Sequence, residues 1–349
     1  MCIRDRVFLV LRDDSGDLQM SISKANVDEA AFKLARKLDY GDIVVAAGPV
    51  GATQKGEICI WADRFELHAK SLVPPPEKYH GLADPELRYR RRSVDMYANP
   101  QTIETFRLRS RLVTRIRRFM DGRDYLEVET PMMQPIAGGA AARPFMTHHN
   151  ALGINIYLRV ATELYLKRLL VGGMPRVYEI NRNFRNEGVD RSHNPEFTSM
   201  EVYQAFGDCW TMLELTESLL HELAVSVTEA GPDEREAGPD ERSEEGPGGR
   251  EEETKSRRDE VTKCAGNEAG PVLPFGDLEI DWSRPFERIA YGELFQRTLG
   301  FSMTEAEKLL VKAEEIGIDN ARRIDHWLLV NRVYEQLCEP QIDLTRPTF

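Results

Sequence analysis

The chain has 349 residues, of which 41% are hydrophobic, and its formal net charge is −12. This length is enough for two domains, and because no apolar run is long enough to cross a bilayer, the composition excludes an integral membrane protein. The five cysteines, an odd number without Cys-x-x-Cys spacing, indicate neither a disulfide framework nor a zinc site. No signal-peptide pattern opens the sequence, so we expect a cytoplasmic protein.

Residues 1–73 predict a small domain rich in strands. Residues 8–11 and 18–22 alternate as strands do, and the turn between them is rich in Asp, Ser and Gly, which is a hairpin pattern. Two further strands are predicted over residues 43–47 and 58–62.

One helix is predicted between these strand pairs. Asn26 and Glu29 have the spacing of an N-cap and its N3 partner, and Gly41 is predicted to end the helix. Its apolar stripe consists of Ala31, Leu34, Ala35 and Leu38. Short strands with one intervening helix favour a small β-barrel.

The proline run at 74–76 marks a linker, and we place the second domain over residues 74–349. Residues 102–120 predict a helix with its apolar side chains near one face. A strand over 125–129 follows and leads into Thr130-Pro131.

Two features precede the most informative segment. The sequence QPIAGGAAARPF at residues 134–145 contains Gly138-Gly139, where backbone can approach a ligand closely. A helix is predicted over 159–170, with Glu163 near its start. From the residues alone, a mobile loop and a carboxylate that only caps the helix remain open as alternatives.

Residues 182–203 read RNFRNEGVDRSHNPEFTSMEVY. The alternating flanks over 176–180 and 200–206 predict two antiparallel strands joined by a long loop. Glu201 and Tyr203 lie two apart on one predicted strand, so they share a face and could bind one ammonium group.

The other side chains of this segment are suited to a nucleotide. Arg185 offers a planar fork of donors for a phosphate, and His193 can donate to a terminal phosphate. Glu187 can accept a hydrogen bond from an exocyclic amine, and Phe197 offers a flat apolar face for a base. A surface hairpin with solvated charges would explain each residue alone, whereas the combination favours a nucleotide site.

The segment resembles motif 2 of the class II aminoacyl-tRNA synthetases, and FRNEG followed by HNPEFT and Glu-x-Tyr is similar to its form in the lysyl-tRNA synthetases. The segments at 134–145 and 159–170 resemble the same family, and residues 102–131 resemble its motif 1. The resemblance implies an α+β fold. An N-terminal OB-fold β-barrel over residues 1–73, incomplete at its N-terminus, would precede a class II antiparallel sheet flanked by helices over 74–349.

The implied activity is lysine–tRNA ligation, in which L-lysine is activated by ATP to lysyl-adenylate and transferred to the 3′ end of tRNA(Lys). By resemblance, Arg185 and His193 would be catalytic and would bind ATP. Glu187 and Phe197 would also contact ATP. The residues implied to bind lysine are Gly139 and Glu163 for its α-amino group and Glu201 and Tyr203 for its ε-ammonium group.

The resemblance also implies Mg²⁺, a homodimer formed through motif 1 and an OB-fold that binds the tRNA anticodon. Phe8, Gln19 and Phe32 are candidates for base contact or core, and core is favoured for the two phenylalanines. The chain ends in RPTF, which resembles a family strand that precedes motif 3. We therefore expect an incomplete and inactive fragment, without metal ligands of its own because these would lie beyond Phe349.

Charge is distributed unevenly along the chain. Residues 229–270 contain EAGPDER twice in tandem and hold 14 acidic against 7 basic residues, so a disordered acidic insertion is predicted there. Residues 81–182 hold 17 basic against 10 acidic residues, which could attract a tRNA backbone.

Three other functions remain open at this point. The nearest is a synthetase of the same subclass for aspartate or asparagine, although these typically carry Asp where Asn186 stands. The second is a non-catalytic tRNA-binding or regulatory paralogue, against which Arg185, Glu187, His193 and Phe197 argue. The third is a lysine-activating enzyme that modifies a protein, which normally lacks the N-terminal barrel.

Overall fold

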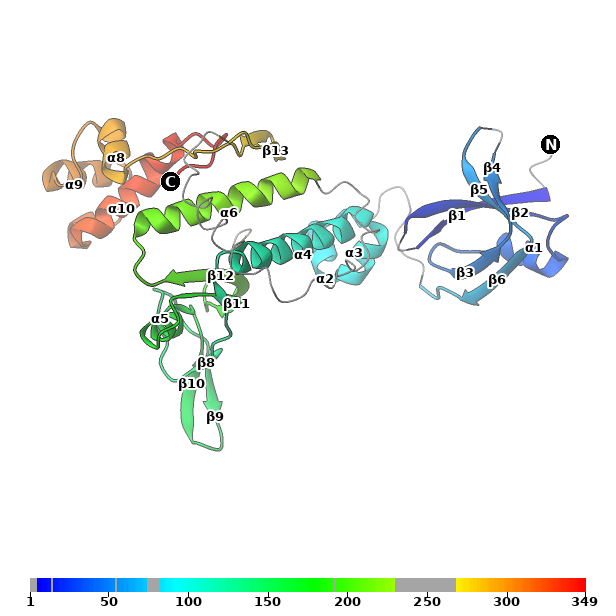
Figure 1. Ribbon diagram of the computed structural model, residues 1–349, viewed down its shortest axis with the longest axis horizontal. Coiled ribbons are helices and arrows are strands. Elements are labelled where there is room, and N and C mark those ends of the chain that lie inside the picture. Colours follow the sequence, from blue (N-terminus) through cyan, green and yellow to red (C-terminus); the bar gives the residue numbers. More distant parts are fainter. Residues whose placement is uncertain (1–4, 14, 54, 74–81, 191–192, 230–267) are drawn as a thin grey trace, which may run out of the picture. The chain divides into compact units, whose positions relative to one another are not determined.

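The computed structural model describes residues 5–13, 15–53, 55–73, 82–190, 193–229 and 268–349. These residues form two compact units, 1–108 and 109–349, whose helices and strands are shown in Figure 1. The predicted acidic insertion at 229–270 lies outside the described residues except at its two ends.

The N-terminal unit is built around a four-stranded sheet with the strand order β1-β2-β5-β4. Its strands are β1 (Arg6–Arg12), β2 (Asp17–Ser23), β5 (Ile58–Ala62) and β4 (Val50–Ala52). The hairpin of β1 and β2 and the strand over 58–62 confirm the sequence prediction. The strand over 43–47 is also confirmed as β3 (Ile43–Ala47), but it pairs with β6 (Arg64–Ala69), which was not predicted.

The chain bends between β3 and β4 at Gly48. A side chain there would begin 2.0 Å from the carbonyl oxygen of Trp61, so only glycine fits. Bonds from Trp61 N to Pro49 O (2.9 Å) and from Asp63 N to Ala47 O (3.0 Å) fix this bend. Because β1 and β4 remain edges of the sheet and β3-β6 is bonded as a separate pair, the described strands form no closed barrel, which corrects that part of the prediction.

The helix predicted between the strand pairs is α1 (Glu29–Ala35), shorter than predicted. Asp28, not Asn26, is its N-cap, because the Asp28 carboxylate accepts from Ala31 N at 2.7 Å. The helix ends well before Gly41. Phe32 is only 5% exposed and belongs to the core, as favoured, whereas Phe8 is 52% exposed and the core expectation for it was wrong.

Three helices lie between residue 82 and residue 121: α2 (Pro85–Arg90), α3 (Arg92–Ala98) and α4 (Pro100–Asp121). The last confirms the helix predicted over 102–120. Buried Asp95 on α3 joins all three, because Arg88 of α2 and Thr102 of α4 both bond to its carboxylate, at 2.6 and 3.2 Å.

The C-terminal unit contains a three-stranded sheet in the order β12-β11-β7, formed by β12 (Glu196–Gln204), β11 (Arg176–Phe184) and β7 (Leu126–Glu127). The long hairpin of β11 and β12 confirms the two strands predicted around the loop. β11 continues to Phe184, beyond the predicted end, whereas β12 begins earlier than predicted, at Glu196, and ends earlier, at Gln204. One face of this hairpin is apolar and packs on α4 and α6 (Cys209–Glu229). The packed residues are Tyr178, Ile180, Met200 and Val202 of the sheet, Ile116, Phe119 and Met120 of α4, and Leu215 and Leu219 of α6.

A smaller sheet in the order β8-β10-β9 precedes the hairpin. Its strands are β8 (Met133–Gln134), β10 (Ile154–Leu158) and β9 (Met146–His149), and α5 (Glu163–Val171) follows directly. The helix predicted over 159–170 is therefore present, with Glu163 as its first residue.

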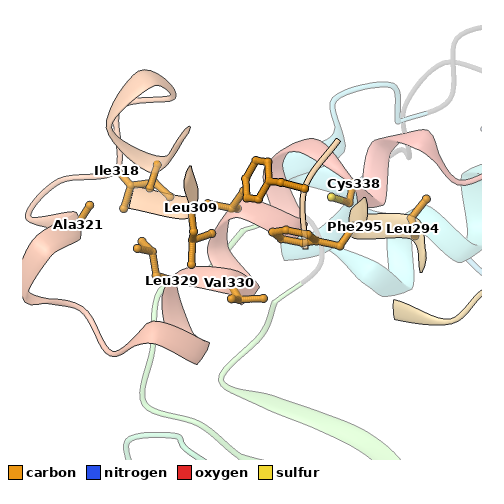
Figure 2. Packing of buried hydrophobic residues seen from close by; sticks show 11 residues of the cluster. Leu294, Phe295, Leu309, Ile318, Ala321, Leu329, Val330 and Cys338 are labelled. Carbon is orange, nitrogen blue, oxygen red and sulfur yellow. The ribbon is translucent and has the colours of Figure 1, made fainter. Parts of the chain in front are cut away.

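The remaining residues form a hairpin and a helical cluster. The hairpin is β13 (Val272–Phe275) with β14 (Leu278–Asp281), and the helices are α8 (Tyr291–Leu299), α9 (Ala306–Glu315), η2 (Ala321–Arg323), α10 (His326–Leu337) and η3 (Glu339–Gln341). Figure 2 shows their core, which includes Leu294, Phe295, Leu309 and Val330. Among the described helices, none is long and apolar enough to cross a membrane.

Candidate active site

The hairpin of β11 and β12 presents a polar face opposite its packed face. Side chains alternate along a strand, so those next to Tyr178, Ile180, Met200 and Val202 must point away from the α4 and α6 helices. The polar face carries Glu179, Asn181 and Asn183 from β11 and Phe197, Ser199, Glu201 and Tyr203 from β12. Six residues of the sequence predictions thus belong to the hairpin or the loop that it carries, and two of them, Glu201 and Tyr203, lie side by side on its face.

The Glu201 carboxylate is held from two directions. Its Oε1 atom accepts from the backbone N of Thr162, at the start of α5, at 3.1 Å, and its Oε2 atom accepts from the Tyr203 hydroxyl at 3.0 Å. Burial raises the pKa of Tyr203, and the charges of Glu201 and Glu163 raise it further. Tyr203 therefore keeps its proton and remains a donor, and it lies near both carboxylates.

Gly139 packs against the start of α5. Its φ angle is +91°, and a Cβ atom at this position would lie 3.1 Å from the Cβ atoms of both Ala161 and Glu163. A side chain would thus meet both a backbone conformation that disfavours it and a tight contact. The structure brings Gly139 and Glu163 together, as the resemblance implies, and the Glu163 carboxylate is 2.6 Å from Lys167 Nζ.

At the other end of the hairpin, Arg185 lies over Phe197. The guanidinium carbon is 5.1 Å from the ring centroid, and the backbone N of Arg185 donates to Pro195 O at 2.8 Å. The Nε atom of Arg185 is buried without a hydrogen-bond partner in the described structure. A flat ring and a cationic fork with an unsatisfied donor thus stand next to each other, which suits a base and a phosphate.

Glu187 connects this loop to the segment that contains the glycine pair. Its Oε1 atom accepts from Arg143 N at 3.4 Å, and the backbone of Asn186 donates to Arg143 O at 2.8 Å. The glycine segment and the loop after β11 therefore form one wall of the site.

His193 lies in the exposed part of the loop. Its side chain is 72% exposed, and Nδ1 is 2.8 Å from the Asp190 carboxylate. Of the predicted nucleotide residues, Arg185 and Phe197 are therefore in contact with each other. His193 instead pairs with Asp190 in the exposed part of the loop.

Sequence reasoning missed a buried polar network beneath these residues. The Arg159 and Glu179 side chains are 0% and 1% exposed, and Arg159 Nη1 is 2.7 Å from Glu179 Oε1. Asn183 is also buried and donates to Ser199 Oγ at 2.6 Å. The sequence did contain an indication of this network, because Glu179 is a charged residue between apolar neighbours in a predicted strand.

Magnesium binding can be examined only at the residues that the structure describes. Within the described ranges, no group of three or more His, Cys, Asp and Glu side chains could hold a metal ion.

Two family models match the sequence. The model described as tRNA synthetases class II (D, K and N) matches residues 84–332. The model described as OB-fold nucleic acid binding domain matches residues 4–74. Together they cover both the unit that carries the exposed Phe8 and the hairpin that carries the polar face.

Curated relatives match over nearly the whole chain. The "Lysine--tRNA ligase" of Carboxydothermus hydrogenoformans is 43% identical over 346 residues, which are 98% of this chain and 62% of that protein. The protein of the same name from Pelotomaculum thermopropionicum is 42% identical, over 98% of this chain and 60% of its own length. One from Teredinibacter turnerae is 55% identical over 226 residues, 64% of this chain and 44% of that protein. The chain thus spans less than two thirds of the length of these relatives.

Proposed function

Because this chain belongs to the class II (D, K and N) tRNA synthetase family, we propose that its protein is a lysine–tRNA ligase. The protein would activate L-lysine with ATP and transfer it to the 3′ end of tRNA(Lys). The names of the relatives support lysine as the amino acid.

The observation that carries the choice of lysine is the pair of carboxylates near Tyr203. Glu201 of β12 accepts a hydrogen bond from this hydroxyl, and the charge of Glu163, at the start of α5, helps to raise its pKa. A substrate with two ammonium groups would find a negative partner for each of them, with Glu163 and the backbone of Gly139 toward the α-amino group. The same carboxylates would repel the acidic side chain of aspartate.

Arg185 and Phe197 are the proposed ATP contacts. Adenine would stack on the Phe197 ring, Glu187 would accept from its amino group, and the Arg185 fork would bind the α-phosphate. His193 would face the outer phosphates from the exposed loop. These contacts lie at the far end of the hairpin from Glu201 and Tyr203, so amino acid and nucleotide would lie along one face.

The proposed reaction requires no nucleophile from the protein. A carboxylate oxygen of lysine attacks the α-phosphorus in line, the bond between the α-phosphorus and the bridging oxygen breaks, and pyrophosphate leaves. A ribose hydroxyl of the terminal adenosine of tRNA then attacks the lysyl carbonyl carbon and releases AMP. The side chains of this chain would align the reactants and stabilise the charge that develops on the phosphate.

The N-terminal unit would bind the tRNA anticodon. This proposal is supported by the exposed side chains of Phe8 and Val10 on β1, of which Val10 lies opposite Gln19 of β2 in the strand register. Aromatic rings on such a sheet stack with unpaired bases. We place the boundary between the two domains at residues 73 and 74, next to the interval between the two matched ranges.

A homodimer and a cytoplasmic location complete the proposal. Large apolar side chains are exposed around the small β8-β10-β9 sheet, and a patch of this kind is typical of an interface between subunits. They are Met133, Ile136, Met146, Leu152 and Ile154.

The decisive experiment measures amino-acid-dependent exchange between ATP and pyrophosphate by the full-length gene product. We expect exchange with lysine and none with aspartate or asparagine. Arg185→Ala should reduce the rate by about a hundredfold or more, because a preorganised donor to the phosphate is lost. Exchange that Arg185→Ala leaves unchanged, or exchange that depends on another amino acid, would contradict the proposal.

A further inference from the structure

Arg159 is a fully buried arginine that the proposed reaction does not use. It follows β10 and precedes α5, and its side chain is 0% exposed. An arginine loses its hydration when it is buried, so its position requires several hydrogen bonds and an opposite charge. Glu179 supplies the charge, with 2.7 Å between Oε1 and Nη1, and Thr130 completes the arrangement by donating to Glu179 Oε2 at 2.6 Å.

The bonds of Arg159 reach the strand that leads into the nucleotide loop. Its Nε atom donates to the carbonyl oxygen of Arg182 at 2.8 Å, and its own carbonyl oxygen accepts from Phe184 N at 2.9 Å. Arg182 and Phe184 form the end of β11, and Arg185 follows them immediately. One residue thus fixes the backbone from which the proposed phosphate ligand extends.

Arg159 is equally tied to the amino-acid side of the site. It stands just ahead of Thr162, whose backbone N holds Glu201, and of Glu163. Its Nη1 atom donates to the backbone oxygen of Thr130 at 3.1 Å, and its own N donates to Met132 O at 2.8 Å. The same guanidinium therefore connects the start of α5, the 130–132 segment and the end of β11.

We propose that Arg159 is a positioning residue that sets the distance between the lysine pocket and the nucleotide loop. It touches neither proposed substrate. Its planar fork donates to the Arg182 carbonyl through Nε and to Thr130 and Glu179 through Nη1. A lysine side chain has a single terminal ammonium group, which cannot occupy the positions of both nitrogen atoms. Loss of the fork would let the two half-sites shift relative to each other, so the carboxylate and the α-phosphorus would lose their in-line alignment.

This inference rests on the proposed function, and its test separates binding from chemistry. Arg159→Lys keeps a positive charge for Glu179 and removes the bond to Arg182. In lysine-dependent pyrophosphate exchange by the full-length gene product, we expect kcat to fall by about tenfold to a hundredfold. The KM values for lysine and for ATP should stay within about threefold, since the contacts of each half-site remain.

The matched control is Arg176→Lys. Arg176 lies on β11, the strand that carries Glu179 and Arg182, and like Arg159 it donates to a backbone carbonyl, that of Arg123, at 2.9 Å, but it belongs to neither half-site. We expect its kcat and both KM values to equal those of the parent. A residue with a merely structural role would lower the unfolding temperature and the folded fraction, so kcat is calculated per folded molecule, as measured by circular dichroism.

A second variant covers the case in which Arg159→Lys does not fold. The double variant Arg159→Met with Glu179→Leu removes both buried charges together, which proteins often tolerate. It should fold and show the same selective loss of kcat. Parental kcat in a folded Arg159→Lys or double variant, or a rise in KM without a fall in kcat, would overturn the inference. A parent protein without lysine-dependent exchange would instead contradict the proposed function, and this is seen before any variant is made.

Discussion

At the scale of single residues, the hydroxyl of Tyr203 has a specific task in the proposed pocket. It donates to Glu201 Oε2 at 3.0 Å, and because burial and the nearby carboxylates raise its pKa, it stays protonated through the neutral range. Tyr203→Phe removes this donor and leaves the ring. We expect the KM for lysine in pyrophosphate exchange to rise about tenfold, as for the loss of a hydrogen bond to a charged group, with little change in kcat.

The control for this prediction is Tyr40→Phe, which removes a tyrosine hydroxyl in the N-terminal unit. It should leave the KM for lysine unchanged. A Tyr203→Phe enzyme with the parental KM would show that the hydroxyl does not shape the lysine pocket.

A comparison of alanine substitutions at Gly139 and Gly153 separates the effect of backbone strain from the effect of a steric clash with neighbouring side chains. Both have positive φ angles, +91° and +63°, but a Cβ atom at Gly139 would lie 3.1 Å from Glu163 Cβ, whereas Gly153 has open space. Alanine at either position should lower the free energy of unfolding by about 1–2 kcal/mol because of the left-handed backbone. Only Gly139→Ala should also raise the KM for lysine, by about threefold or more, because it displaces Glu163. Equal KM values in the two variants would remove Gly139 from the pocket.

The site residues that could be predicted from the sequence are neighbours on one strand, whereas those that were missed contact residues from distant parts of the chain. Glu201 and Tyr203 were predicted as neighbours because a strand places alternate residues on one face. Arg159 was not singled out, since its partners Thr130, Glu179 and Arg182 come from segments that only the fold brings together. Phe8 was misassigned because an alternating pattern gives two faces without saying which one is buried.

At the scale of elements, Asp95 holds the helices α2, α3 and α4 together through its charge. Burial alone would raise the pKa of its carboxyl group, but hydrogen bonds from Asn99, Arg88, Thr102 and Arg92 outweigh burial and lower the pKa to about 2. Since the ordinary value is 3.8, the folded state binds this proton less readily than the unfolded chain. The stabilisation is therefore complete above pH 4 or so and is lost as the pH falls toward about 2.

Thermal unfolding between neutral pH and about pH 2 tests this linkage. We expect the melting temperature of the parent to fall most steeply below about pH 4, and we expect Asp95→Asn to be less stable at neutral pH and to lose less on acidification. Asp63→Asn, at an exposed aspartate, is the matched control and should follow the parent. If Asp95→Asn shows the acid sensitivity of the parent, the carboxylate is not the source of the effect.

Prediction of elements depended on their length and on local signals. The helix over 102–120 has an apolar face sustained over several turns, and α4 confirms it. β4 has only three residues and β6 follows β5 almost directly, so neither stands out in the sequence. The cap of α1 moved from Asn26 to Asp28 because two cap residues lie within one turn of each other, and only the structure shows which one accepts from the helix.

At the scale of the whole molecule, the two units carry tasks that can be separated by measurement. The proposed anticodon surface is the face of β1 and β2 with Phe8, and the proposed activation site is the β11-β12 hairpin with Arg185. In the proposed reaction, activation of lysine involves only the site on the β11-β12 hairpin. A substitution on the proposed anticodon surface should therefore impair transfer to tRNA without affecting pyrophosphate exchange.

Phe8→Ala is the variant that tests this separation. Removal of an aromatic ring that stacks on a base costs about 1–3 kcal/mol, so the KM for tRNA in aminoacylation should rise about tenfold or more. Val50→Ala, at another exposed apolar residue of the same unit, is the matched control and should leave this KM unchanged. Because Phe8 is exposed, neither variant should unfold the domain, and both should show parental pyrophosphate exchange. A rise in the KM for tRNA with both variants would indicate a general effect on the unit, and no rise with Phe8→Ala would place the anticodon contact elsewhere.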